Sequence, residues 1–261
     1  MAHQIGFKKL FSNAFERTVF NKLETWFLND GAKVVHNCAL PWPSKGVTEI
    51  DTIMIHTSGI YVLECKRWSG VITNSGNRYH KYIPHHDKED YDEDCVNPFW
   101  QNHLHIKCLA KLLKRELGIY GVPFHSLAVF PDACSIEGIR PAYDNEYPVH
   151  LKSSMVKTIR RIDTLYGRVL PEWQIEDIHD LLKHYEPKSQ EERIANAYRI
   201  RQQRSASFEK KEWVWLRYSD NQNVTYQEEI PRHQKKQLNS SNLLGFSRNL
   251  IHTAAPTYPL A

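Results

Sequence analysis

Three charged residues, Asp51, Glu64 and Lys66, interrupt two otherwise apolar stretches of the chain. Two carboxylates and an ammonium group suit chemistry on a phosphate ester, because Mg²⁺ prefers a few carboxylates together with water and phosphate oxygens. A lysine beside such an ion can orient or deprotonate the attacking water, or steady the charge that develops on phosphorus. These residue types therefore suggest metal-dependent phosphodiester cleavage. The alternative is a set of ordinary ion pairs with Lys66 and Arg67 at the edge of a sheet.

This chemistry requires the three side chains to converge. Side chains alternate between the two faces of a strand, so Glu64 and Lys66 share a face. A two-residue turn at Ser58-Gly59 would pair Ile53 with Glu64 and Asp51 with Lys66, which brings all three charges to one face. A turn of odd length would put Asp51 on the opposite face. The prediction therefore depends on an even register.

The rest of the chain alternates between helical and strand patterns. Apolar residues at helical spacing predict helices, and alternating runs bounded by Gly, Pro, Asn or Asp predict strands. The predicted helices are 11–29, 97–117, 154–166, 171–185 and about 190–205, and the predicted strands are 33–40, 49–56, 60–66, 71–72, 78–83, 124–130, 149–151, 213–218 and 224–229. This order predicts an α/β fold, with a central mixed sheet that carries an antiparallel hairpin at its active edge and is flanked by helices.

An acidic run precedes the second predicted helix. Six of the eight residues 87–94 are Asp or Glu, and such a run repels itself, so 85–95 is expected to be a solvated loop. His85-His86 at its start could bind a metal ion, but an exposed loop is the simpler interpretation. Asn97 and Pro98 then have the residue types of a helix cap and a first helical position.

Other histidines and tryptophans offer weaker signals. His103 and His105 are two residues apart on the predicted helix and should point to different sides of it, so a joint metal site is not expected. Trp68 and Trp100 could stack on bases, although aromatic residues near a sheet more often belong to the core.

Composition sets the broad class of protein. The 261 residues are 41% hydrophobic and 25% charged, which is typical of an ordinary globular protein. No apolar run has the length of a membrane span or of a secretory signal, so we expect a cytoplasmic protein without a membrane partner. The five cysteines form an odd, scattered set without a CxxC motif and are expected to be free thiols: Cys38, Cys65, Cys95, Cys108 and Cys134.

The positive charge is uneven along the chain. Residues 1–185 hold 22 Lys and Arg against 22 Asp and Glu, whereas residues 186–261 hold 12 against 8, so the net charge of +4 lies in the C-terminal part. Such a segment suits a polyanionic partner, or is simply a solvated tail. The break in composition at Glu186-Pro187 predicts two domains, 1–186 and 187–261.

Several quoted segments together resemble a known family. They are AFERTVFNKL (14–23), EID (49–51), GIYVLECKRWSG (59–70) and NPFWQN (97–102). In this order they resemble the nuclease-related (NERD) domain, a branch of the PD-(D/E)XK nuclease superfamily, and the resemblance extends over roughly 11–185. It implies a restriction-endonuclease-like α/β core with a small basic C-terminal extension.

The resemblance implies roles for individual residues. Asp51 and Glu64 would bind Mg²⁺ or Mn²⁺, with the backbone carbonyl of Cys65 as a third ligand. Glu16, from the opening helix, would complete the metal site or orient a ligand. Lys66 would be the catalytic lysine. Two features depart from the family pattern: Cys65 replaces a more usual aliphatic residue, and the acidic run resembles an insertion of unassigned role.

Gln101, in the NPFWQN segment, would orient Lys66 or a phosphate group. The resemblance therefore implies a metal-dependent deoxyribonuclease. A non-cleaving module is the alternative: it would bind nucleic acid or dock to a helicase or another partner, and a defence or mobile-element system is one context for it. In either case the basic segment 190–217 would contact the phosphate backbone or a partner protein. The candidate nucleic-acid-binding residues are Arg67, Trp68, Arg199, Arg201 and Arg204.

Overall fold

The computed structural model describes residues 8–42, 46–84, 90–208, 213–219 and 225–231. The chain divides into two compact units, Met1–Ile200 and Arg201–Ala261. No helix among the described residues is both long enough and apolar enough to cross a membrane. The elements in chain order, up to the helix that runs past Ile200, are α1 (Lys8–Phe27), the 3₁₀ helix η1 (Leu28–Asp30), β1 (Lys33–Trp42), β2 (Gly46–His56), β3 (Gly59–Cys65), β4 (Val71–Ser75), β5 (Arg78–Ile83), β6 (Tyr91–Cys95), α2 (Pro98–Leu117), β7 (Phe124–Phe130), β8 (Ser135–Gly138), β9 (Glu146–His150), α3 (Met155–Tyr166), α4 (Glu172–Lys183) and α5 (Gln190–Phe208).

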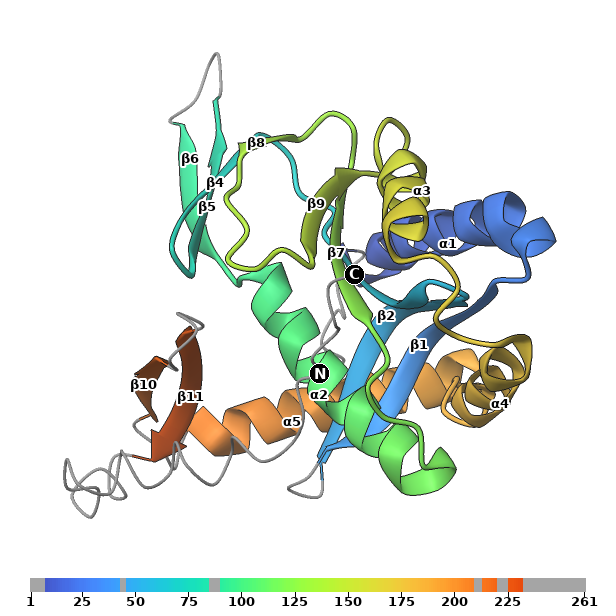
Figure 1. The fold of residues 1–261 in the computed structure, drawn as a ribbon. Helices are drawn as coiled ribbons and strands as arrows, with labels where there is room; N and C mark the ends of the chain where they lie inside the picture. The colour runs from blue at the N-terminus through green and yellow to red at the C-terminus, as the bar shows by residue number, and fades with distance from the viewer. Residues whose placement is uncertain (1–7, 43–45, 85–89, 209–212, 220–224, 232–261) are drawn as a thin grey trace. The chain divides into compact units, whose positions relative to one another are not determined.

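The central sheet of the first unit is mixed, as predicted (Figure 1). Its strand order is β1-β2-β3-β7-β9. The pairs β1–β2 and β2–β3 are antiparallel, whereas β3–β7 and β7–β9 are parallel. The parallel step from β3 to β7 needs a long crossover, which contains α2. Strand β3 therefore lies at the centre of the sheet, and β4, β5, β6 and α2 lie between it and β7 in the chain.

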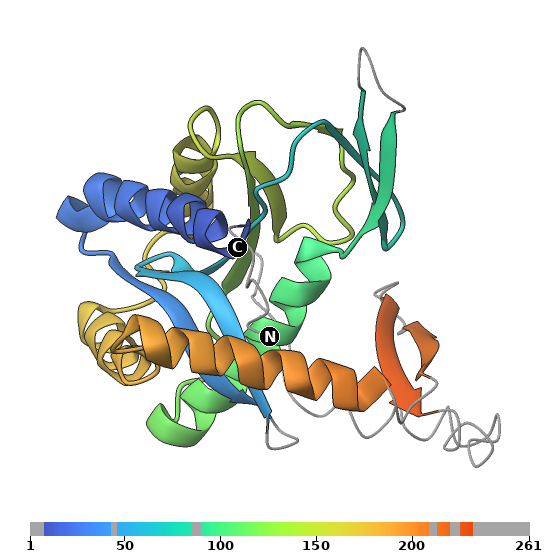
Figure 2. The ribbon, with the colours of Figure 1, turned by 180° about the vertical axis from the view of Figure 1, so that it is seen from behind.

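Helices cover both faces of this sheet (Figures 1 and 2). Buried residues of α2 and α4 form one cluster with β1, β2 and β3, and buried residues of α1 and α3 form another with β2, β3, β7 and β9. Side chains that alternate along β3 divide between the two clusters: Ile60 and Val62 join the first, and Tyr61 and Leu63 join the second. The α/β prediction with a helix-flanked mixed sheet is confirmed.

A second, smaller sheet has the order β6-β5-β4-β8. Strands β6, β5 and β4 form antiparallel neighbours, and β8 pairs parallel to β4. The sequence did not predict β8. The expected acidic loop is wrong over β6, which is an edge strand. Its acidic side chains have basic partners on β5, as Lys81 pairs with Glu93 (2.6 Å) and His80 with Asp94 (2.8 Å). Residues 85–89, including His85-His86, lie outside the described part of the chain.

The turn between β2 and β3 also differs from the prediction. It consists of Thr57-Ser58, and Gly59 is already paired as the first residue of β3. The turn is still two residues long, but the register is shifted. In continuation of the observed pairs, Asp51 falls in line with Glu64 and not with Lys66.

Gly59 has a different task from the one predicted. Its φ is +131°, and a Cβ atom there would lie 2.6 Å from the carbonyl oxygen of Pro123, just before β7. The glycine thus permits the close approach of β3 to the start of β7, where the amide of Ile60 donates to that same carbonyl (2.9 Å). The predicted end of the first strand at residue 40 was also wrong, because β1 continues through Pro41 to Trp42.

Strict alternation along β2 breaks at Asp51. Ile50 and Ile53 are three residues apart, yet both pack in the cluster with α2 and α4. The ladder between β2 and β3 ends at the pair Thr52 and Leu63. Asp51 therefore lies where the two strands cease to pair, and side chains from both strands can share one space there.

Helix α2 is fixed to the sheet at its first turn. The side chain of Asn97 accepts hydrogen bonds from the amides of Phe99 (2.9 Å) and Trp100 (3.2 Å), so the predicted cap is confirmed. The buried Asn102 donates through Nδ2 to the carbonyls of Val62 (3.0 Å) and Leu127 (3.1 Å). This one amide thus bridges β3 and β7 and sets the position of α2 above them.

Helix α5 begins in the first unit, whose last residue is Ile200. The amide of Ala39 donates to the Tyr185 carbonyl (2.9 Å), and Glu186 accepts from the amide of His36 (2.8 Å), so the chain is bonded to β1 at the boundary that composition suggested. In the second unit, β10 (Trp213–Ser219) and β11 (Thr225–Pro231) form an antiparallel pair.

Candidate active site

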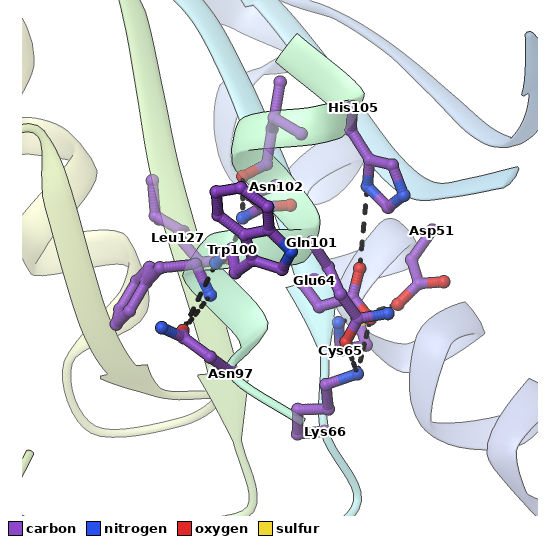
Figure 3. A network of polar contacts seen from close by, with 12 residues as sticks. Asp51, Glu64, Cys65, Lys66, Asn97, Trp100, Gln101, Asn102, His105 and Leu127 are labelled. Atoms are coloured by element: carbon purple, nitrogen blue, oxygen red, sulfur yellow. Dashed lines mark hydrogen bonds and ion pairs between the residues drawn. The ribbon is translucent and has the colours of Figure 1, made fainter. Parts of the chain in front are cut away.

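Lys66, just beyond the end of β3, lies at the centre of a polar cluster (Figure 3). Its ammonium group donates to Glu64 Oε1 (2.6 Å) and to Gln101 Oε1 (2.6 Å). Lys66 and Glu64 are 15% and 6% exposed in their side chains, so the ion pair is largely shielded from water. The amide of Lys66 donates to the Val129 carbonyl (2.9 Å), which holds this residue beside β7. The predicted residues Glu64, Lys66 and Gln101 are thus brought together.

Asp51 joins the cluster from β2. Its Oδ2 accepts a hydrogen bond from the amide of Cys65 (2.7 Å). Burial raises the pKa of the Asp51 carboxyl well above its ordinary value, and the charges of Glu64 and Glu16 raise it further; Lys66 and the Cys65 amide act in the opposite direction. Negative charge is therefore concentrated at this point, and a bound cation would relieve it.

The donor set fits a hard divalent cation. Among the described residues, no three His, Cys, Asp or Glu side chains gather into a complete metal-binding group. Mg²⁺ does not need such a group, since one or two carboxylates with water and substrate oxygens suffice. Burial, with the charges of Asp51, Glu16 and Glu64, raises the pKa of the Cys65 thiol. The thiol is therefore protonated at neutral pH, and the backbone carbonyl is the only donor that this residue can offer to Mg²⁺.

Glu16 is engaged by a residue that the sequence had not linked to the site. The guanidinium group of Arg193, in α5, donates to Glu16 Oε2 (2.5 Å) and to Glu49 Oε1 (3.4 Å). Glu49 lies two residues before Asp51 on β2. The predicted metal ligand Glu16 therefore forms an ion pair in this structure, although its charge reaches Asp51.

His105 is a second residue that sequence reasoning missed. It is buried, and its Nδ1 lies 3.7 Å from Glu64 Oε2 (Figure 3). As the spacing predicted, His103 points elsewhere and stacks on Trp100, with 5.7 Å between ring centroids. His105 follows Gln101 by four residues, and this helical spacing was the available signal that both face the same strand end.

Asn37 is a third missed residue. Its φ of 54° is the one positive value outside glycine among the described residues. It lies between His36 and Cys38 on β1, whose partners on β2 flank Asp51. It is buried, and its Oδ1 has no hydrogen-bond partner within the described residues. A strained backbone and an unpaired buried oxygen beside a buried carboxylate are typical of functional sites.

The candidate nucleic-acid-binding residues are scattered. Arg67 is exposed, next to the catalytic candidates. Trp68 is partly buried against Phe130, with 5.7 Å between ring centroids, and lies 5.9 Å below the ammonium group of Lys66. Arg199 is exposed on α5 and bonds to Asn196 (3.5 Å). The side chains of Arg201 and Arg204 lie outside the described part of the structure.

Comparison with known proteins supports the resemblance over the first half of the chain. Residues 12–131 match the model of the nuclease-related domain (NERD). A Bacillus anthracis protein that is named as uncharacterized is 32% identical over 108 residues, which are 41% of this chain and 46% of that protein. The chain thus spans less than half of that relative's length. No solved structure matches the chain. The matched residues 12–131 include Glu16, Asp51, Glu64, Lys66 and Gln101, so this part of the chain is similar to the nuclease-related domain, whose general class is the PD-(D/E)XK superfamily.

Proposed function

We propose that the chain is a nuclease that cleaves phosphodiester bonds in DNA with the help of Mg²⁺ or Mn²⁺. The observation that carries the proposal is the convergence of Asp51, Glu64, Lys66 and Gln101 where β2 and β3 cease to pair. The nuclease-related domain match supports the same reading for the part of the chain that holds these residues.

Each side chain would have a distinct task. Asp51 and Glu64 would hold the ion with their carboxylate oxygens, together with the Cys65 carbonyl. A bound divalent ion supplies charge stabilisation at a phosphate oxygen and acidifies a bound water. Lys66 would place positive charge beside the phosphate, and Gln101 would fix the direction of the ammonium group through the 2.6 Å hydrogen bond.

A direct assay tests the proposal. Supercoiled plasmid, linear duplex and single-stranded DNA are incubated with the purified full chain in Mg²⁺, Mn²⁺ or EDTA. We expect cuts that need a metal ion and that fall about 100-fold or more in Asp51→Asn, Glu64→Gln and Lys66→Gln, since each removes a group that would hold the ion or place positive charge beside the reacting phosphate. Circular dichroism and thermal melting verify that each variant is folded.

A charge-matched control comes from the same molecule. Lys111 is an exposed lysine on α2, ten residues after Gln101, and Lys111→Gln removes the same charge as Lys66→Gln. It should cleave like the parent chain. A folded Glu64→Gln variant that cleaves at the parent rate would exclude this mechanism.

A second candidate function is nucleic-acid binding without cleavage. The observation in its favour is that both Glu64 oxygens have basic neighbours, Lys66 and His105, while Arg193 engages Glu16. Contact with DNA would then depend on exposed basic residues outside these ion pairs, such as Arg67 and Arg199. Retention of DNA in EDTA, together with the absence of cuts in Mg²⁺ and Mn²⁺, would favour this candidate.

A further inference from the structure

Arg193 links three elements around the candidate active site. It lies near the start of α5, and its guanidinium group contacts Glu16 of α1 and Glu49 of β2. The side chains of Arg193, Glu16 and Glu49 are only 16%, 14% and 17% exposed. A shielded ion triad of this kind is costly to break, because any partner that remains is left charged and poorly solvated. The ion pairs of Arg193 with Glu16 and Glu49 are therefore a stable part of the first unit.

The two carboxylates that Arg193 engages belong to the charge cluster around Asp51. Glu49 is two residues from Asp51 on β2, and Arg193 contacts Glu49 and Glu16 together, so Glu16 lies near the strand that carries Asp51. The cluster has four carboxylates, Glu16, Glu49, Asp51 and Glu64. Lys66 and Arg193 offset part of this charge. Without Arg193, one of these two positive charges would be lost from the cluster.

We propose that Arg193 is a positioning residue that lowers the cation affinity of the site by retaining Glu16 and offsetting the charge of Glu16 and Glu49. This inference rests on the proposed function, since it concerns the ion that Asp51 and Glu64 would hold. Because Glu16 is bound to Arg193, it would not act as a ligand of the metal ion. Helix α5 thereby sets the divalent-ion concentration that the site needs, through a residue that contacts Glu16 and Glu49.

The direction of the effect separates this role from a structural one. Removing Arg193 takes away a positive charge that offsets Glu16 and Glu49, so the site attracts a divalent cation more strongly. At short range and intermediate effective dielectric, one unit charge changes the Kd by about tenfold. General damage to the site would instead weaken binding. We therefore expect Arg193→Gln to bind Mn²⁺ about three- to tenfold more tightly than the parent chain.

The experiment is a titration of the full chain with MnCl₂, followed by isothermal calorimetry and by the electron paramagnetic resonance signal of free Mn²⁺. Arg193→Lys, which keeps the charge, should bind close to the parent value. Arg115→Gln is the charge-matched control, because Arg115 pairs with exposed Glu116 near the end of α2. It lies fourteen residues from Gln101, about 21 Å along the helix, and should leave the Kd unchanged.

The outcomes are distinguishable. Folded Arg193→Gln with an unchanged or weaker Mn²⁺ affinity overturns the inference and leaves the proposed function standing. A parent chain that binds no Mn²⁺, or binds it equally well as Asp51→Asn, overturns both. If Arg193→Gln does not fold, the single variant Glu16→Gln is compared with the double variant Glu16→Gln/Arg193→Gln. The double variant removes both partners of the ion pair. The double variant should bind Mn²⁺ more tightly than Glu16→Gln alone, and equal affinity overturns the inference.

Discussion

At the scale of single residues, the direction of the Lys66 ammonium group is the feature that the structure adds. An ammonium group carries three N–H donors, and Glu64 and Gln101 accept two of them within the described residues. The third is then available to a water molecule or a phosphate oxygen. Gln101 contributes a neutral acceptor, which orients Lys66 without adding a further negative charge beside Glu64.

Replacing Gln101 should therefore reduce turnover more than stability. We expect Gln101→Leu to lower the rate of DNA cleavage about 10- to 100-fold, because the ammonium group loses one of its two fixed directions. Gln101→Glu, which restores an acceptor, should recover part of this loss. Single-turnover cleavage at saturating protein measures the effect, and parent-like rates in Gln101→Leu would contradict it.

The sequence identified the site residues unevenly. The sequence identified Asp51, Glu64 and Lys66 as site candidates, because charged residues rarely occur within apolar strands without a partner. Gln101 came from a resemblance and not from spacing. Arg193 could not be linked to Glu16, since 177 residues separate them and no local pattern records a contact of that range. Asn37 was hidden for a related reason: its strain and its position opposite Asp51 exist only once β1 and β2 pair.

At the scale of elements, the small sheet depends on a close backbone contact at Gly70, which lies between Lys66 and β4. Gly70 has a φ of +83°, and a Cβ atom there would lie 2.1 Å from the Tyr82 carbonyl oxygen. Only glycine allows β4 to begin this close to β5. Side chains of the small sheet then pack with Phe130 of β7 and Phe99 of α2, the elements that flank Lys66.

Gly70→Ala should thus destabilise the fold by about 2–3 kcal/mol, as steric overlap adds to the strain of a positive φ. Gly76→Ala is the matched control. Its φ is also positive, at +58°, but a Cβ atom there would have open space, so the expected cost is about 1 kcal/mol. Urea unfolding of both variants measures the difference, and equal losses would show that the Tyr82 contact is unimportant.

Most elements followed from local patterns, and the exceptions have a physical cause. Helical spacing and alternation predicted α1 to α5 and the strands of the central sheet. Strand β6 was misjudged because the charges of Glu93 and Asp94 are balanced by Lys81 and His80, which only strand pairing brings close. The turn register was wrong because the reason for Gly59, its closeness to Pro123, lies outside the hairpin.

At the scale of the whole molecule, the segment after α4 is part of the first unit and not a linker. Glu186 is 11% exposed and accepts hydrogen bonds from the amide of His36 (2.8 Å) and its Nδ1 (3.2 Å), and from the ammonium group of Lys183. Burial alone would raise the pKa of Glu186, but these donors outweigh it and lower the pKa from 4.5 to about 2. The ionised carboxylate thus stabilises the fold.

The pH dependence of this contribution has a definite sign. A carboxyl group whose pKa is lowered on folding stabilises the fold fully above its unfolded pKa, and the contribution is lost as the pH falls towards the folded pKa. Glu186→Gln should therefore cost about 2 kcal/mol at pH 7, after allowance for the half-exposed Lys183. The gap between parent and variant should narrow below pH 4.5 and close near pH 2, as followed by urea unfolding at each pH. A constant gap would exclude this role.

The ion pair between Arg193 and Glu16 also has a consequence during synthesis. Helix α1 is synthesised before α5, and the partner of its Glu16 is made 177 residues later. At 5–20 residues per second, this delay is roughly 10–35 s. A nascent chain can already contain Asp51, Glu64, Lys66 and Gln101 while Glu16 still lacks Arg193. If Arg193 lowers the cation affinity as proposed, the nascent site would attract divalent ions most strongly in this period, and synthesis of α5 would end it.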